Sequence, residues 1–406
     1  MKGIKKILFL LYVSSFVACA ASKASVQQNN EPAVFVLDVK TLEKNKSKIK
    51  ANDPELAASY KLLLKDADKV LQWGPVSVME KKNTPPSGDK HDYMSLAPYH
   101  WPNPDTKDGL PYIRKDGQTN PEVKEYKDKE YLPKLCGDVY TLALAYFFSG
   151  ENKYAEHAAT LLRVWFLDTA TRMNPNLNFG QAIKGHNTGR GAGMIDTRHF
   201  VKLIDAIGLL QNSNNWKAAD QQGMKEWFSA FLNWMQTSKN GMDEMNATNN
   251  HGAWYDAQRL SMALFIGDKA AANKIVLSAA ARLDQQLDDN GYFPKELERT
   301  ISLHYTSFVM EAFFNIAQMA EHTGEDLWNR VTPSGKSLKK AFETTHPFLT
   351  GEKEWQHPQI KPYETEQAYF LLENAALQFN CKNCKDEIKK LAGDKAGRLR
   401  INLLYP

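Results

Sequence analysis

Apolar residues recur at the spacing of a helix through most of this 406-residue chain, and this pattern limits its possible folds more than any other feature. Two stripes show it: Tyr154, Ala158, Leu161, Leu162 and Trp165 in one segment, and Trp227, Phe231, Trp234 and Met235 in another. Stretches with the two-residue alternation of a strand are scarce. The pattern predicts a fold built from amphipathic helices.

Glycine followed by an acid recurs between the predicted helices, at Gly150, Gly267, Gly324 and Gly351. Glycine ends a helix readily because it adopts left-handed backbone angles, and an acid suits the positive N-terminus of the next helix. Each site predicts a helical hairpin, and several hairpins in one chain predict an all-α fold, an (α/α) toroid that forms an incomplete barrel. A solenoid is the alternative, but the spacing lacks the fixed period of a repeat array.

The first 22 residues have a basic start, an apolar stretch from Ile7 to Val13 and a small-residue exit, which is typical of a secretory signal. Cleavage could follow Ala20 or precede a lipidated Cys19. We expect a signal peptide at 1–20, a flexible tether at 21–33 and one catalytic toroid domain at 34–406. The protein would then be periplasmic or an outer-membrane-anchored lipoprotein. No later apolar run reaches the length of a membrane span.

The charge pattern points to a local anion site. Removing the three lysines of the leader lowers the formal net charge from +4 to +1, so no overall basic field favours nucleic acid. Segment 186–200, HNTGRGAGMIDTRHF, nevertheless gathers two histidines and two arginines around a glycine-rich turn. Such a patch in a cleft suits an anionic ligand. The simpler interpretation is that His199 is structural and that Asp196 forms an ordinary ion pair with Arg198.

The remaining cysteines suggest structural roles. Cys381 and Cys384 form a C-x-x-C pair, and a zinc ribbon would need a second pair, which the sequence lacks. In an exported protein the pair is expected to be a local disulfide or two structural thiols rather than a redox centre. Cys136 lies in an apolar helical context and is expected to be a small buried residue.

Segment 80–125 departs from the helical pattern because it is rich in proline and contains Tyr93, Tyr99, Trp101 and Tyr112. A loop of this length in a compact domain is usually functional. Its aromatic rings, if exposed, could stack on the faces of sugars. The alternative is that they only cover the end of the toroid against solvent.

Another cluster, NATNNHGAWYDAQ at 246–258, places Asn249, Asn250 and His251 directly before a predicted helix. Asparagine is a good N-cap, and an amide together with an imidazole at the positive end of a helix can receive a carboxylate. A single histidine in such a place is more often structural. The cluster becomes informative only beside other groups of the same chemistry.

Those groups are in ELERTISLHYTSF, which supplies Arg299, His304 and Tyr305; a bend near Ser302 would let the arginine and the tyrosine face one cleft. The combination suits β-elimination beside a uronic acid, because removing the C5 proton requires the neighbouring carboxylate to be neutralised. A tyrosine, with an ordinary pKa of about 10, becomes a plausible base when cationic neighbours lower that value. It can then return the proton to the leaving oxygen.

The motifs SGDKHDYMSLAPYHWP (87–102), NNHGAWYDAQ (249–258) and RTISLHY (299–305) resemble the alginate lyase superfamily of α/α-toroid polysaccharide lyases, close to polysaccharide lyase families 5 and 38. The resemblance covers most of residues 55–375. It implies that Asn250 and His251 neutralise the substrate carboxylate, that Arg299 assists, and that Tyr305 is the acid and base. It also implies a second active-site histidine, His186, which we expect to be the base for guluronate, whose C5 proton lies on the far side.

We therefore expect an exported, monomeric polysaccharide lyase that cleaves alginate by β-elimination without a cofactor or metal. The expected substrate-binding residues are Arg190, Arg198, Lys90, His91, Tyr93, Tyr99, Trp101, Trp254 and His304. Three alternatives stay open: a lyase for another polyuronate such as glucuronan, a non-catalytic glycan-binding lipoprotein, and a toroid hydrolase. The hydrolase would need two acids across the cleft, from among Asp288, Asp289, Glu296 and Glu298.

Overall fold

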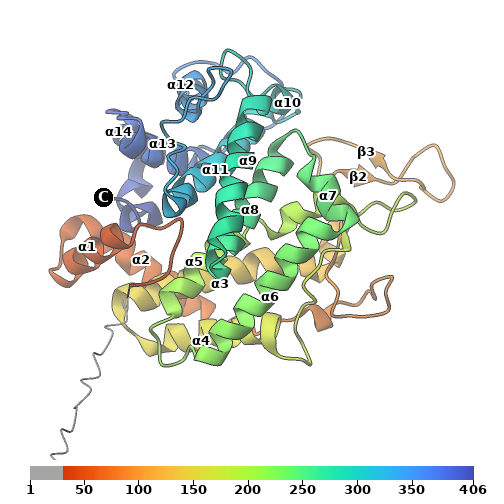
Figure 1. The fold of residues 1–406 in the computed structure, drawn as a ribbon, viewed down its shortest axis with the longest axis horizontal. Helices are drawn as coiled ribbons and strands as arrows, with labels where there is room; N and C mark the ends of the chain where they lie inside the picture. Colours follow the sequence, from red (N-terminus) through yellow and green to blue (C-terminus); the bar gives the residue numbers. More distant parts are fainter. Residues whose placement is uncertain (1–30) are drawn as a thin grey trace, which may run out of the picture. The chain divides into compact units, whose positions relative to one another are not determined.

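Helices dominate the computed structural model, which describes residues 31–406 (Figure 1). The predicted signal peptide, Cys19 and most of the predicted tether lie outside the described residues. The α-helices of the described part are α1 (Val39–Lys50), α2 (Pro54–Val70), α3 (Lys127–Ser149), α4 (Asn152–Leu162), α5 (Phe200–Leu210), α6 (Ala218–Thr237), α7 (Lys239–Met245), α8 (Asn250–Ile266), α9 (Lys269–Gln286), α10 (Pro294–Leu297), α11 (Ser302–Ala320), α12 (Leu338–Leu349), α13 (Glu366–Gln378) and α14 (Cys384–Ala392).

The helices pack as an inner series with partners outside it. In the inner series α3 contacts α5, α5 contacts α8, α8 contacts α11, and α11 contacts α13. Outside it, α4 packs on α3, α6 and α9 pack on α8, and α12 packs on α11; Figure 1 shows α8 between α9 and α6. Helices α8 and α11 are buried on nearly every side, as interior helices must be. The predicted all-α (α/α) toroid is confirmed.

The glycine signals predict two hairpins correctly and two wrongly. Gly150 and Gly267 adopt left-handed angles, with φ of 77° and 84°, and end α3 and α8; α4 and α9 begin two residues later. Gly324 and Gly351 are also left-handed, but no α-helix of the described chain starts directly after them. Both lead into long connections that contain prolines, such as Pro333 after Gly324, and proline interrupts a helix by removing a backbone donor.

Short strands give the segment at 80–125 its shape. Strand β1 (Met94–Leu96) pairs in parallel with β4 (Phe179–Ala182), and β2 (His100–Trp101) pairs antiparallel with β3 (Ile113–Arg114). Short 3₁₀ turns flank them at Val78–Glu80 and Pro121–Glu125. The β2–β3 hairpin projects from the helices in Figure 1. The β1–β4 pair ties the proline-rich segment to the chain that leads into residues 186–200.

The core of the described unit, Pro32–Pro406, contains both apolar stripes seen in the sequence, apart from Trp234, which is half-buried and donates its indole N–H to Asn178. At the start of the unit, the buried Asp205 carboxylate on α5 accepts the backbone N–H groups of Phe35, Val36 and Leu37. Burial raises the pKa of Asp205 to about 6, against the lowering effect of these donors. None of the helices in residues 31–406 is long and apolar enough to cross a membrane.

The cysteines take structural places. Cys381 and Cys384 form a local disulfide rather than two separate thiols. Cys136 on α3 is a free thiol, 2% exposed, as expected of a small buried residue. Burial raises the pKa of its thiol well above the usual range, so it is an inert part of the core.

Candidate active site

Three adjoining pockets form a cleft beside the N-termini of α8 and α11. The central pocket, with a cavity volume of about 510 Å³, is lined by Tyr305, His251 and Asn250 among others. It shares Tyr99, Arg198, Tyr305 and Phe308 with a second pocket of about 340 Å³, called the Trp254 pocket after one of its lining residues. It shares His100 and Arg114 with a third, the His186 pocket. A chain of sugars could occupy such a row of pockets.

The central pocket is strongly cationic. Its lining includes five cationic side chains and one carboxylate, that of Glu244; the cations are Arg114, Lys129, Arg190, Arg198 and Arg299. Three of them are paired with acids nearby, Lys129 with Asp196, and Arg299 and Arg114 with Asp116. The excess positive charge in a concave, partly desolvated site attracts anions from a distance and holds them.

His251 lies in the first turn of α8, where the N-cap Asn249 accepts its backbone N–H through Oδ1. Its ring Nδ1 lies 2.7 Å from Oε1 of Glu244, whose side chain is 5% exposed. A carboxylate at Nδ1 keeps the proton on that nitrogen, which leaves Nε2 as the ring's free nitrogen. The pair has the arrangement of a histidine base oriented by an acid.

Asn250 is less available than the sequence suggested. The residue is fully buried, and both its backbone N–H and its side-chain Nδ2 donate to the carboxylate of Glu296, at 2.6 and 2.8 Å. One amide N–H remains for a ligand. Glu296, one of the acids considered for a hydrolase, is buried behind Asn250 and lines none of the three pockets, so it supports an amide rather than facing a substrate.

Arg299 and Tyr305 converge as predicted, because α11 begins at Ser302 and the chain turns just before it. The guanidinium carbon of Arg299 lies 3.6 Å from the centre of the Tyr305 ring. Its Nε and Nη2 donate to Asp116, whose second oxygen also accepts the backbone N–H of Thr300. Burial works to raise the pKa of Asp116, but Arg299 outweighs it and holds that pKa well below the usual range. Arg299 is therefore a clamped cation that packs on the tyrosine.

The pKa of Tyr305 is raised, whereas the sequence led us to expect that cationic neighbours would lower it. Burial raises it well above the usual range, and the lowering effect of Arg299 does not compensate. The hydroxyl donates to Tyr99 at 3.0 Å, and Tyr99 adds to the upward shift. A cationic neighbour favours the phenolate, but desolvation opposes it, and at Tyr305 the effect of desolvation is the larger of the two. In the free protein Tyr305 carries its proton, which suits a general acid.

The glycine-rich segment gains its shape from close backbone packing. A Cβ at Gly189 would lie 2.0 Å from the carbonyl oxygen of Asn178, and one at Gly193 would lie 2.6 Å from the backbone of Gly180. Only glycine fits at such distances. The result is that Arg190 lies against β4, where it donates to Gln181 at 2.9 Å, while its Nε has no partner among the described residues. Arg190 lines the central pocket, as expected of a substrate-binding residue.

Asp196 does not pair with Arg198, so that part of the simpler interpretation is wrong. The Asp196 carboxylate is fully buried and bonds to Lys129, Gln181, Ser95 and Tyr93. Arg198 instead donates to the carbonyl of Ile195 and lies over the ring of Phe308, at 5.5 Å, on the wall between two pockets. Arg198 is thereby left with capacity for an anion.

Tyr93 is not an exposed stacking ring. It is 0% exposed, and its hydroxyl donates to Asp196 at 3.0 Å, so it holds the floor of the segment rather than a sugar. Lys90, His91 and Trp101 also lie outside the lining of the three pockets. The His91 ring pairs with the carbonyl of Arg172, and the Trp101 indole donates to Gln118 in the β2–β3 region. Of the predicted aromatic residues in this segment, Tyr99 is the one that reaches the central pocket.

His186 lies next to the central pocket rather than in its lining. It lines the third pocket together with Tyr112, whose carbonyl lies 3.2 Å from its Nε2, and it does not line the central pocket that contains Tyr305. The turn at residues 183–187 directs it to the β2–β3 side of the cleft. The structure therefore places His186 in the pocket beside the one that contains Tyr305, and its role as a base stays a prediction.

The Trp254 pocket holds the remaining predicted residues. Trp254 and His304 line it, together with His199. Both ring nitrogens of His304 have partners, Gln359 at 2.7 Å and the backbone N–H of Glu364 at 3.4 Å. Burial, then Arg198 and two lysines, lower the pKa of His199 to about 3, so this histidine is neutral near pH 7.

Several residues of the site could not be predicted from the sequence. His100 stands inside a motif quoted above, yet only the structure shows that it lines the central pocket with an Nδ1 that has no partner among residues 31–406. Burial, then Arg190 and Arg114, lower its pKa to about 4. Nothing in the sequence around Glu244 or Asp116 distinguishes them from other acids. Glu244 pairs with His251 only because of the fold, and Asp116 pairs with Arg299, which is far away in the sequence.

Solved structures of alginate lyases resemble this chain. The chain is 40% identical to an alginate lyase from Bacteroides ovatus, with a TM-score of 0.88 over 92% of this chain and 99% of that one. Alginate lyase A1-III from Sphingomonas species A1 shares the fold at 16% identity, with a TM-score of 0.57 over 86% of this chain and 89% of that one. A histidine-to-alanine variant of A1-III complexed with tetrasaccharide matches at 15% identity and a TM-score of 0.56, over 87% and 89%.

Fold and relatives together define the protein as an α/α-toroid polysaccharide lyase. The family model described as alginate lyase matches residues 77–355, and the chain belongs to the alginate lyase family. This confirms the resemblance found in the sequence. Among curated protein sequences, none matches the chain.

Proposed function

We propose that this lyase cleaves alginate by β-elimination in the central pocket. The observation that carries the proposal is the lining of that pocket, in which five cations and one carboxylate surround Tyr305 and His251. A polymer with one carboxylate per sugar matches this charge. The relative from Bacteroides ovatus, itself called an alginate lyase, supports the choice of polyuronate.

In this proposal the substrate carboxylate is neutralised by the remaining N–H of Asn250 and by the guanidinium groups of Arg190 and Arg198. All three residues line the central pocket, and Nε of Arg190 has no partner among the described residues. Neutralising the carboxylate stabilises the charge that develops when the C5 proton leaves, an effect worth about 10²–10³ in rate for a single donor. Arg299 contributes by packing on Tyr305, because its Nε and Nη2 already donate to Asp116.

We assign the acid role to Tyr305 and the base role to His251. Tyr305 keeps its proton in the free protein and can deliver it to the departing glycosidic oxygen. Nε2 of His251 is available to take the C5 proton, since Glu244 holds the proton on Nδ1. The expectation that Tyr305 performs both steps gives way to this division because burial disfavours its phenolate.

The test is the initial rate of ultraviolet absorbance of unsaturated uronate on alginate for the wild type, Tyr305→Phe and His251→Gln. We expect each variant to lose about 10²–10⁴ of kcat. Tyr363→Phe is the matched control, since its hydroxyl bonds to Ser307 and it lines none of the three pockets. New reducing ends without a rise in absorbance would mean hydrolysis and would refute the proposal.

A polyuronate other than alginate, such as glucuronan, meets the same carboxylate chemistry and is the second candidate. Assays on homopolymeric mannuronate, guluronate and glucuronate separate the two: the highest kcat/KM on glucuronate would replace alginate in the proposal. We also propose that the protein is exported, as its first 22 residues indicate. Fractionation of expressing cells, with labelled fatty acid to detect acylation of Cys19, tests this.

A further inference from the structure

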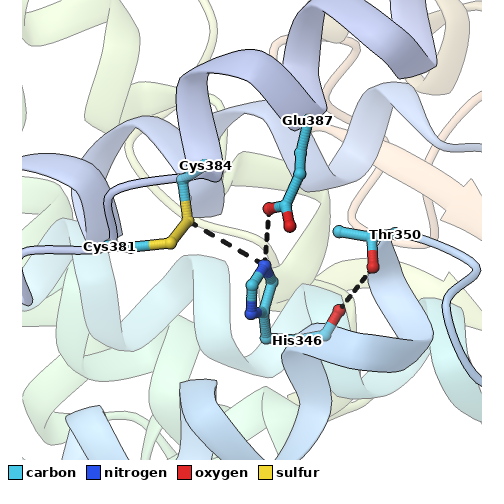
Figure 2. The surroundings of a disulfide bond; sticks show 5 residues. All are labelled: His346, Thr350, Cys381, Cys384 and Glu387. Atoms are coloured by element: carbon cyan, nitrogen blue, oxygen red, sulfur yellow. Dashed lines mark hydrogen bonds and ion pairs between the residues drawn. A yellow bond between two sulfur atoms is a disulfide. The ribbon is translucent and has the colours of Figure 1, made fainter.

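A cluster outside the cleft brings together two cysteines, a histidine and a glutamate. His346 is in α12, Cys381 precedes α14, Cys384 is the first residue of α14, and Glu387 follows one turn later (Figure 2). One ligand atom from each lies within 4.8 Å of all the others. None of the four lines the pockets of the cleft.

The geometry around His346 is that of a shared centre. Its Nε2 lies 2.6 Å from Oε2 of Glu387 and 3.9 Å from Sγ of Cys384, and Figure 2 shows the ring aimed at both. In a tetrahedral zinc site, with Zn–S of about 2.3 Å and Zn–N of about 2.0–2.1 Å, sulfur and nitrogen ligands are about 3.5 Å apart. Small side-chain movements would therefore place these three atoms around one ion. A disulfide alone needs neither an imidazole nor a carboxylate beside its sulfur.

We propose that His346, Cys381, Cys384 and Glu387 form a redox-dependent site for a thiophilic divalent cation such as Zn²⁺. The C-x-x-C spacing is one that structural zinc sites use, and the second pair of ligands missing from the sequence pattern comes from α12 and α14. In the disulfide form the sulfurs are bonded to each other and are poor ligands. In the reduced form the thiolates are good ligands, because the thiolate is the metal-binding species.

The interconversion balances with a dithiol as the reductant. A dithiol reduces the Cys381–Cys384 bond with two electrons and two protons, giving two thiols and the disulfide of the reductant. The cation then replaces the two thiol protons, which go to solvent, so two Cys–S–M bonds form as two S–H bonds break. The metal would link α12 to α14, and Lys382 and Lys385 beside the cysteines would offset the net negative charge of the ligand set.

Co²⁺ is the spectroscopic probe for this site, added to the full chain before and after reduction. We expect the reduced wild type to bind one equivalent with a tetrahedral d–d spectrum and a thiolate-to-cobalt charge-transfer band, and the oxidised protein to show neither. Added Zn²⁺ should displace the Co²⁺ and so remove its absorption bands. Reduced protein without stoichiometric binding, or oxidised protein with the same spectrum, would overturn the proposal.

Variants test the ligand set while keeping the sulfurs. His346→Gln and Glu387→Gln should each weaken Co²⁺ binding by more than about 100-fold, since loss of partners beyond the direct ligands already costs 10–100-fold. Cys19→Ala and Cys136→Ala are the controls and should keep the spectrum. Far-ultraviolet circular dichroism checks the fold of each variant. Unchanged binding in a folded His346→Gln protein would overturn the assignment of the four ligands. The outcome is independent of lyase activity.

Discussion

Replacing Asp116 with Asn should damage both stability and catalysis, because this acid holds Arg299 against Tyr305. The side chains of the pair are 12% and 18% exposed, and the acid accepts two donors from Arg299, two from Thr300 and one from Arg114. Breaking an ion pair costs up to about 1 kcal/mol at the surface and about 3–5 kcal/mol when fully buried, so we expect about 3 kcal/mol here.

That loss converts into a measurable shift of the melting temperature. Unfolding entropy of about 2.1 cal/mol/K per residue, over the unit Pro32–Pro406, gives about 0.8 kcal/mol/K, so Asp116→Asn should lower Tm by about 4 °C. The matched control is Glu325→Gln, which breaks the Arg330 pair of 2.6 Å with side chains about a third exposed and should shift Tm by about 1 °C at most.

The substitution should also slow catalysis, because Arg299 packs on the ring of Tyr305. Freed from Asp116, Arg299 no longer has to lie over the Tyr305 ring, and a displacement of about 1 Å near reacting groups costs about 10² in rate. We expect kcat on alginate to fall by about that factor, with a smaller change in KM. In an Arg299→Gln background the same substitution should have little further effect, because the two residues act as a unit. Independent, additive losses in the two variants, or an Asp116→Asn protein with wild-type kcat, would refute the reasoning.

Three further outcomes are expected. Arg190→Ala should raise KM on alginate, most strongly at low salt, because charges are screened over about 8 Å at physiological ionic strength; a KM equal to wild type at every salt concentration would contradict this. The double variant His100→Gln/His199→Gln should lose less stability than the wild type when pH falls from 6.5 to 4, as measured by urea unfolding. The folded pKa values of about 4 and 3 lie below the unfolded value, so the unfolded chain binds these protons first as pH falls. Equal slopes of unfolding free energy against pH in the two proteins would argue against this. EDTA should leave lyase activity intact, since amide, imidazole and guanidinium groups perform the neutralisation; loss restored by one divalent ion would show otherwise.

The sequence predicted the helices and many residues of the site better than the contacts between residues that are distant in the chain. Helical spacing and glycine ends reveal the toroid because they are local signals, and the turn before α11 brings Arg299 to Tyr305 as expected. The missed residues act across the fold: Asp116 is 183 residues from Arg299, and no periodicity links them. Residue type says what a side chain can do but not which side of a backbone turn it will lie on, so the sequence could not show that Tyr93 is buried or that His186 lines the neighbouring pocket.

The site divides its work between helices and connections. Asn250, His251 and Tyr305 occupy the first turns of interior helices, whereas Tyr99, Arg114 and Arg190 come from strands and turns that rest against them. Mutation of the second group can therefore leave the helices in place, but Tyr99 must be kept because it accepts the hydroxyl of Tyr305. A lineage that keeps Tyr99, Arg190 and Arg198 can change the polymer it accepts by insertions and other replacements in residues 98–114 and 183–198, and a protein engineer seeking new specificity has the same two segments to diversify.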